Sequence, residues 1–152
     1  MQLYMSILPF MRITILTFGK PRQEFVRVGV AEFVKRLSRF ADVSLVHLKE
    51  ASTEADIEKH AKRAQLILLD ERGTEYTSAG FAKALDMYTQ RGTDVVFCIG
   101  GADGHTTDIR SIPHTTMALS ELTLPHEMAL LFFVETLYRS LTISAGHPYH
   151  RE

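Results

Sequence analysis

Three stretches in the last third of the chain carry side chains and backbone features that could take part in chemistry. They are residues 100–104, with the sequence Gly-Gly-Ala-Asp-Gly, residues 119–126, and the terminal residues 147–152. The terminal stretch combines two histidines with a tyrosine and an arginine. Because the last residues of a domain usually fray unless something holds them in place, we expect this stretch to belong to a functional site.

The glycine pair Gly100-Gly101 follows an apolar run, residues 95–99, that is typical of a buried strand. Glycine adopts positive φ readily and lets a ligand touch the backbone directly. The spacing matches neither the Rossmann fingerprint nor a P-loop, so standard dinucleotide and triphosphate binding are disfavoured. On these residues alone, a plain tight turn is the simpler interpretation.

Residues 120–125 form a mostly apolar segment with two hydroxyl groups, from Ser120 and Thr123. Such a loop could offer backbone groups and an apolar wall to a flat heteroaromatic ring, or it could be an ordinary packed connection. His126 follows at the start of a predicted helix. It could act as a base, or stay neutral because a helix N-terminus disfavours the charged imidazole, and a purely structural histidine is the more common outcome.

Metal-dependent and serine-hydrolase chemistry are both disfavoured. His147 and His150 are three residues apart, but the only cysteine, Cys98, lies in an apolar run, and no His-Glu-x-x-His pattern supplies further zinc ligands. We therefore expect no metal site. The chain also lacks the Gly-x-Ser-x-Gly motif that presents the nucleophile in many hydrolases.

The composition is that of one compact soluble domain, with 152 residues of which 45% are hydrophobic and 23% charged. A single cysteine allows no disulfide within the chain, so a reducing cytoplasm is the expected location. Residues 1–10 lack the features of a signal peptide, and no apolar run is long enough to cross a membrane. We expect residues 1–10 to be a leader or upstream-start extension and residues 11–152 to form a single domain.

The net charge of −1 argues against a protein that binds nucleic acid by charge alone. The charges are unevenly distributed, because residues 1–49 carry eight lysines and arginines but only three acidic residues. A solvated helix face is a simpler explanation for this excess than an RNA-binding patch.

Strands and helices alternate in the sequence pattern. Alternating or continuous apolar runs predict strands, and apolar residues at three- and four-residue steps predict helices. The strands are predicted over residues 12–18, 43–48, 66–69, 95–99 and 116–119, and the helices over 24–40, 53–63, 77–90 and 126–143. This order predicts an α/β domain with a mainly parallel sheet flanked by helices.

Ligands of such sheets bind outside the carboxyl ends of the strands. The segments after three of the predicted strands, Leu69-Asp70, residues 100–104 and residues 120–125, should therefore meet at one edge of the sheet and form a pocket. Residues 70–73 are expected to turn away from the third strand.

Taken together, four motifs in this order resemble one family. They are Ile99-Gly100-Gly101-x-x-Gly104, Ser120-x-Leu122-Thr123-Leu124-Pro125-His126, Glu135-x-x-Tyr138-Arg139 and Pro148-Tyr149-His150-Arg151. The family is that of ribosomal RNA large subunit methyltransferase H, within the SPOUT class of S-adenosylmethionine-dependent enzymes. The likeness runs from about Met11 to the end of the chain, and the ordered set is far more specific than any one motif.

The resemblance implies a homodimer whose α/β fold contains a C-terminal trefoil knot, an exception to the rule that chains avoid knots. It also implies that the enzyme methylates N3 of a pseudouridine in the 23S rRNA hairpin that contacts the small subunit, with the assembled ribosome as substrate. No membrane and no metal are implied. The cofactor S-adenosylmethionine would contact Leu69, Gly101, Ser120, Glu121, Leu122, Thr123, Leu124 and Pro125.

The resemblance further implies that the tail residues Tyr149, His150 and Arg151 line the target site and could complete the pocket of the partner subunit. From the chemistry of methyl transfer, we expect catalytic roles for these residues and for His126. His126 or His150 would handle the imide proton of the target base, while Tyr149 and Arg151 position the nucleotide and stabilise its anionic ring. Arg139 could contact phosphate or form a helix salt bridge with Glu135.

Two residues depart from the family pattern as we know it. Leu130 stands where members tend to carry arginine, and Glu121 adds an acid to the cofactor loop. Two alternatives stay open on sequence grounds. One is a non-catalytic ribosome-binding module that keeps the fold, and the other is a flavodoxin-like nucleotide-binding protein, which would have no knot and no role for the tail.

Overall fold

The structure is a computed structural model that describes residues 11–151, so the leader predicted over residues 1–10 lies outside the described part. Its elements are β1 (Arg12–Phe18), α1 (Glu24–Leu37), β2 (Asp42–Leu48), α2 (Glu54–Ala61), β3 (Ala64–Glu75), α3 (Ser78–Gln90), β4 (Asp94–Ile99), α4 (Thr107–Ser111), β5 (Thr115–Ala118) and α5 (His126–Ser144). The predicted α/β architecture is confirmed.

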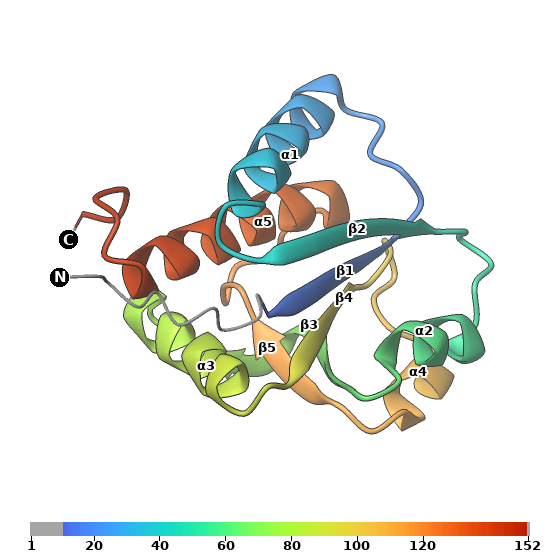
Figure 1. Ribbon diagram of the computed structural model, residues 1–152. Helices are drawn as coiled ribbons and strands as arrows, with labels where there is room; N and C mark the ends of the chain where they lie inside the picture. The colour runs from blue at the N-terminus through green and yellow to red at the C-terminus, as the bar shows by residue number, and fades with distance from the viewer. Residues whose placement is uncertain (1–10, 152) are drawn as a thin grey trace, which may run out of the picture.

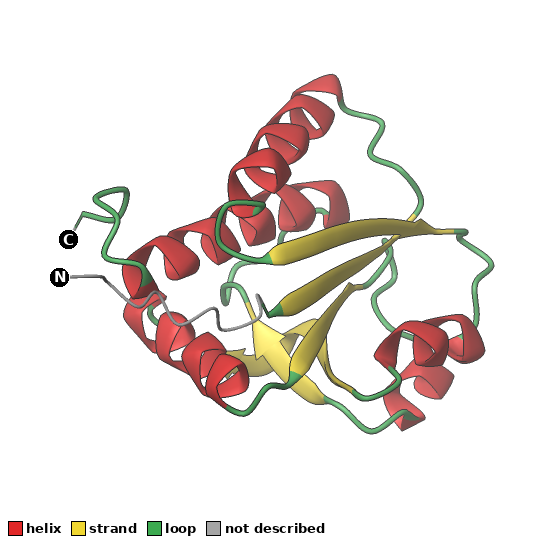
Figure 2. Cartoon of the chain, in the orientation of Figure 1, coloured by secondary structure: helices red, strands yellow, loops and turns green. Residues whose placement is uncertain are grey.

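The five strands form one sheet in the order β2-β1-β4-β3-β5, and every neighbouring pair is parallel. Helices α1, α3 and α5 cover one face of this sheet, while α2 and α4 cover the other (Figures 1 and 2). The flavodoxin order is 2-1-3-4-5, so the exchange of β3 and β4 weighs against the flavodoxin-like alternative.

Strand β4 shows why the central strands are continuous apolar runs. Val95, Phe97 and Ile99 belong to the core under α1, α3 and α5, whereas Val96 and Cys98 belong to the core under α2 and α4. Since a parallel strand alternates between two covered faces, each of its residues must be apolar. The Cys98 thiol is buried, and this burial raises its pKa to about 12.

Two predicted helix starts are confirmed by their caps. Thr53 and Asp56 form a reciprocal capping box at the start of α2, and the Thr77 hydroxyl accepts a hydrogen bond from the Gly80 N–H at 3.0 Å. The end predicted for α1 at Phe40 is wrong, because the helix ends at Leu37. Phe40 still packs on the core from the following turn, with its ring 5.9 Å from that of Tyr138, and so continues the apolar spacing past the helix.

The turn predicted at residues 70–73 is also wrong. Strand β3 runs on to Glu75, and its pairing with β5 shifts register between Leu69 and Thr74. Gly73 makes this possible, because a Cβ there would lie 2.6 Å from the Met117 backbone nitrogen. The polar residues after Leu69 therefore belong to an irregular strand that lies close against β5.

Helix α4 was not predicted from the sequence. It is five residues long, starts where the Thr106 hydroxyl accepts from the Ile109 N–H at 3.2 Å, and buries only Ile109. One buried residue is too few to show helical periodicity.

Within residues 11–151, no helix combines the length and apolar character needed to cross a membrane.

Candidate active site

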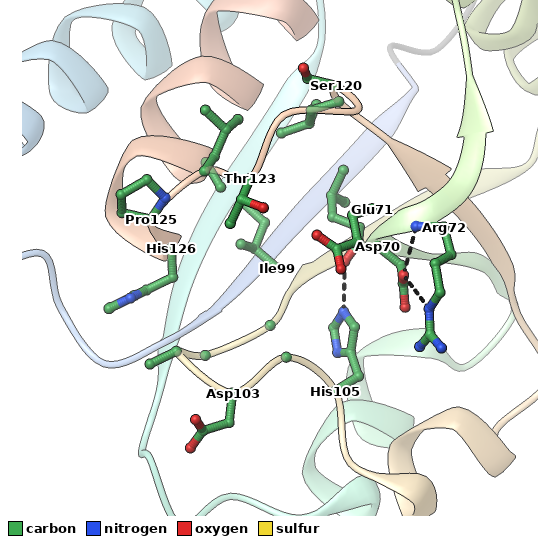
Figure 3. A pocket seen from close by; sticks show the side chains of 18 of the residues that line it. Asp70, Glu71, Arg72, Ile99, Asp103, His105, Ser120, Thr123, Pro125 and His126 are labelled. Carbon is green, nitrogen blue, oxygen red and sulfur yellow. Dashed lines mark hydrogen bonds and ion pairs between the residues drawn. The ribbon is translucent and has the colours of Figure 1, made fainter.

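A pocket of about 840 Å³ lies where residues 69–72 of β3 meet the segments after β4 and β5 (Figure 3). This confirms that the three segments converge at the carboxyl edge of the sheet. Of the eight residues predicted to contact a cofactor, seven line the pocket and Glu121 does not. The seven are Leu69, Gly101, Ser120, Leu122, Thr123, Leu124 and Pro125.

The glycine segment after β4 is a tight turn that forms one wall of the pocket. The Gly104 N–H donates to the Gly101 carbonyl at 3.0 Å, and Gly104 has a φ of 75°. A Cβ at Gly100 would lie 2.9 Å from the Gly104 carbonyl carbon, so the turn itself requires glycine there. At Gly101 the nearest atom to a Cβ would be 3.9 Å away, on Phe18, so the fold leaves that position open toward the pocket.

The loop after β5 forms the opposite wall. The Ser120 hydroxyl accepts from the Leu122 N–H at 3.0 Å, which shapes the turn locally. Apolar side chains of Ile99, Leu119 and Leu124 line the cavity from two sides. This arrangement offers a flat ring an apolar slot between two stretches of backbone.

His126 is the first residue of α5 and lies beside Pro125 at the edge of the pocket, across from Asp70 and Arg72 (Figure 3). Its side chain is exposed. The predicted catalytic histidine is therefore next to the loops predicted to hold the cofactor. Leu130, one turn further along α5, is buried, so it belongs to the core rather than to an RNA-facing surface.

Sequence reasoning missed a charged cluster on the floor of the pocket. The Asp70 carboxylate, only 5% exposed, pairs with the Arg110 guanidinium at 2.5 Å and with Arg72 Nε at 3.4 Å. Burial by itself would raise the pKa of Asp70, but the Arg72 N–H and the two guanidinium groups outweigh it and lower the pKa to about 2. Asp70 therefore stays ionised and links β3 to α4.

His105 was missed as well. Its ring is buried, and Nε2 donates to the Leu69 carbonyl at 3.0 Å, which joins the glycine turn to the end of the regular part of β3. Burial lowers the pKa of His105, so the ring is neutral at physiological pH. No spacing rule connects His105 with Leu69, because they are brought together only by the pairing of β3 with β4.

The Asp70–Arg110 pair makes the free energy of unfolding fall at acidic pH. Because folding lowers the pKa of Asp70, its contribution is fully present above about pH 4 and is lost as the pH falls toward 2. We expect Asp70→Asn to lower the free energy of unfolding by about 2 kcal/mol at pH 7, with the difference from wild type shrinking below pH 4. Urea unfolding at pH 7 and pH 2.5 measures both values.

Arg72→Met is the matched control for this prediction, because the Arg72 side chain is 74% exposed and exposed ion pairs contribute less than about 1 kcal/mol. A pH-independent difference between Asp70→Asn and wild type would contradict the assignment.

The tail residues follow the C-terminal end of α5 and pack back against its C-terminal half. The Tyr149 ring packs on Tyr138 with 4.6 Å between ring centroids, and its hydroxyl donates to Glu135 Oε1 at 3.0 Å. Burial, together with this hydrogen bond, raises the pKa of Tyr149. Arg139 forms the salt bridge with Glu135 at 2.6 Å, so that one of the two predicted roles of Arg139 is present.

His150 and Arg151 complete the tail. His150 Nδ1 lies 3.2 Å from Arg139 Nη1, and Arg151 is exposed. Helix α5 has 19 residues, which corresponds to about 28 Å between its ends. The structure thus brings His126 together with the cofactor loops, whereas the tail follows the C-terminal end of α5 (Figure 1) and Tyr149 folds back to Glu135 in the middle of the helix, about 14 Å along it from His126.

Comparison with known proteins agrees with this architecture. The family described as "Predicted SPOUT methyltransferase" matches residues 11–150. A relative from Deinococcus radiodurans is 41% identical and one from Deinococcus deserti 39%, and each match covers 93% of this chain and at least 99% of the relative. A third, from Thermus thermophilus, is 38% identical over the same share of this chain and 99% of its own.

All three relatives are named ribosomal RNA large subunit methyltransferase H. A crystal structure of a methylase family protein from Neisseria gonorrhoeae shares the fold, with a TM-score of 0.53 at 11% identity over 100% of this chain and 91% of that one. Among residues 11–151, no group of three histidine, cysteine or acidic side chains could hold a metal ion. The chain belongs to the SPOUT methyltransferases, in the family of ribosomal RNA large subunit methyltransferase H.

Proposed function

We propose that this methyltransferase transfers a methyl group from S-adenosylmethionine to N3 of a pseudouridine in the intersubunit hairpin of 23S rRNA, acting on the assembled ribosome in the cytoplasm. The observation that carries the proposal is the pocket itself. Leu69, Gly101, Ser120 and residues 122–126 come from three separate parts of the sequence, yet all of them line one cavity at the carboxyl edge of the sheet. The names of the relatives support an rRNA substrate.

The pocket fits a nucleoside cofactor that carries no phosphate. Its apolar walls and the open backbone at Gly101 suit an adenine ring, and its volume of about 840 Å³ leaves room for a second group. The carboxylates of Glu71 and Asp103 line the same cavity and favour the positive sulfonium and amino groups of S-adenosylmethionine. Arg72 and Arg110 line the cavity too, but both pair with Asp70, so Glu71 and Asp103 are the charges left to disfavour phosphate-bearing nucleotides.

The reaction asks little of the protein beyond positioning. S-adenosylmethionine supplies a methyl group on a sulfonium centre, so the N3–CH₃ bond forms as the S–CH₃ bond breaks and S-adenosylhomocysteine leaves. The chain must hold N3 in line with the methyl group, accept the imide proton and stabilise the negative charge that N3 and its flanking carbonyl oxygens gain. His126 lies at the pocket to accept the proton, while Tyr149, His150 and Arg151 supply donors and orient the base.

We infer that the enzyme acts as a homodimer, because no residue of the tail lines the pocket of its own chain. Phe25 and Val28 on α1 and Met128 and Phe132 on α5 expose apolar side chains, and α1 and α5 pack against each other. Exposed apolar side chains on neighbouring helices are typical of a protein interface. A second copy of this chain on this surface would let the tail of one subunit complete the pocket of the other.

Two further expectations rest on family membership. One is a trefoil knot in the C-terminal part of the domain. The other is an RNA contact near the tail, for which the last turn of α1 offers Lys35 and Arg36. The Arg36 guanidinium lies 5.8 Å from the Tyr138 ring centroid, so this basic turn is adjacent to the residues that hold the tail.

Transfer of radiolabelled methyl groups from S-adenosylmethionine to assembled ribosomes tests the proposal. We expect label in 23S rRNA of ribosomes that contain the pseudouridines of the hairpin and none in ribosomes that lack them. Equal labelling of both would contradict the choice of pseudouridine. Bound cofactor without any label would contradict the target, and absence of cofactor binding would favour the non-catalytic ribosome-binding module.

A further inference from the structure

Hydrogen bonds that run from Glu135 through Arg139 to His150 link α5 to the tail. Glu135 Oε1 accepts from Arg139 Nε at 3.1 Å and from Arg139 Nη2 at 2.6 Å, and Arg139 Nη1 lies 3.2 Å from His150 Nδ1. The Tyr149 hydroxyl donates to the same carboxylate oxygen, and the guanidinium lies 5.0 Å from the Tyr149 ring centroid. Glu135 thus fixes the direction in which Arg139 points its remaining N–H groups.

The direction of the hydrogen bond between Arg139 and His150 decides which ring nitrogen of His150 carries the proton. A guanidinium has N–H groups and no acceptor, and it does not lose its proton in a protein. The hydrogen bond to Glu135 raises the pKa of Arg139 further, so Arg139 donates in every state of interest. His150 Nδ1 must therefore accept, which leaves the ring proton on Nε2.

The Arg139–His150 pair has the opposite hydrogen-bond direction to a carboxylate–histidine pair. When a carboxylate accepts from Nδ1–H, the other ring nitrogen is free to act as a base. Here the neighbour is a donor, so Nε2 already holds a proton and offers an N–H group instead. A carboxylate neighbour therefore makes Nε2 a proton acceptor, whereas an arginine neighbour makes Nε2 a hydrogen-bond donor.

We propose that Arg139 and Glu135 are positioning residues that hold His150 as its Nε2–H tautomer, so that His150 donates a hydrogen bond to a carbonyl oxygen of the target base instead of removing its proton. The inference rests on the proposed function and refines it. When N3 loses its proton, the flanking carbonyl oxygens gain negative charge, and a fixed N–H donor stabilises that charge. The imide proton is then left to His126 or to water.

The tautomer can be measured without any enzymatic activity. In full-length protein labelled with ¹⁵N-histidine, we expect a non-protonated Nδ1 and a protonated Nε2 for His150, with the signals assigned by their loss in His150→Gln. Arg139→Met should bring the two nitrogens toward averaged shifts, because the donor that selects one tautomer is gone. Arg91→Met, an exposed arginine after α3, is the control and should leave the His150 signals unchanged. A protonated Nδ1 in the wild-type protein would overturn the proposal.

Methyl transfer to ribosomes tests the role of that proton. The amide nitrogen of glutamine can take the place of Nε2–H, whereas the shorter asparagine reaches only about as far as Nδ1. We expect His150→Gln to keep kcat within about tenfold of wild type and His150→Asn to lose about 10²-fold, as for loss of one donor to a developing oxyanion. Equal loss in both variants would overturn the donor role.

Failure of the proposed function would look different from failure of this inference. If ribosomes were not the substrate, the wild type and all variants would transfer nothing, yet the ¹⁵N shifts would still report the tautomer. In the active enzyme, Arg139→Met should lower kcat and leave the KM for S-adenosylmethionine unchanged, because Arg139 contacts the tail and does not line the cofactor pocket. A change confined to that KM would count against the positioning role.

Discussion

Removal of residues 148–152 should lower methyl transfer to ribosomes by about 10³-fold or more while S-adenosylmethionine still binds within a few-fold of its wild-type affinity. The reason is the separation of the two parts of the site. Tyr149 and His150 contact Glu135 and Arg139 and do not line the pocket, so a single chain loses no pocket-lining residue when the tail is removed. Single-turnover kinetics and calorimetric titration with the cofactor measure the two effects separately.

Tyr149→Phe separates the packing of the tail from its chemistry, because it keeps the ring packed on Tyr138 and removes only the donor to Glu135. Its thermal unfolding should stay close to that of the wild type, with at most about 1 kcal/mol lost. Wild-type turnover by the truncated protein would show that the tail has no part in the reaction.

A leucine at Gly101 should weaken S-adenosylmethionine binding by at least about 100-fold, or about 2.7 kcal/mol, in a protein that still folds. A Cβ at Gly101 has only Phe18 within 4 Å, at 3.9 Å, so the fold tolerates a side chain. The glycine lines the pocket, so the added side chain would occupy the space of the cofactor. Equilibrium binding together with circular dichroism separates loss of affinity from loss of structure.

Gly100→Ala provides the contrast. Its Cβ would lie 2.9 Å from the Gly104 carbonyl carbon, so the turn must shift and the protein should lose stability even without ligand. If Gly101→Leu instead bound the cofactor normally, the ligand would have to sit elsewhere in the protein.

The sheet could be predicted because its physical causes are local. Residues 95–99 are buried on both faces and must all be apolar, and the caps at Thr53 and Thr77 are made with groups only three residues away, the Asp56 carboxylate and the Gly80 N–H. The continuation of β3 could not be predicted in this way. Residues 70–75 are mostly polar, and they are extended only because Gly73 lets them lie against Met117, more than forty residues further along the chain.

The pocket followed from the rule that ligands bind at the carboxyl edge of a parallel sheet, and the structure brings the three predicted segments together there. The rule does not say which side chains of a segment point inward, and Glu121 lies in the loop without lining the cavity. Asp70 and Arg110 are forty residues apart, and only the placement of α4 near Asp70 in β3 brings their charges together. The five residues of α4 include only one buried residue, so their sequence does not indicate which element the helix contacts.

Mixed dimers test most directly the claim that one subunit supplies the pocket and its partner supplies the tail. Gly101→Leu protein and tail-truncated protein should each be inactive alone. After unfolding and refolding together, half of the dimers are mixed, and each mixed dimer has one intact site, so roughly a quarter of wild-type methyl transfer should return. Activity no higher than that of the two separate proteins, with mixed dimers present, would contradict the account.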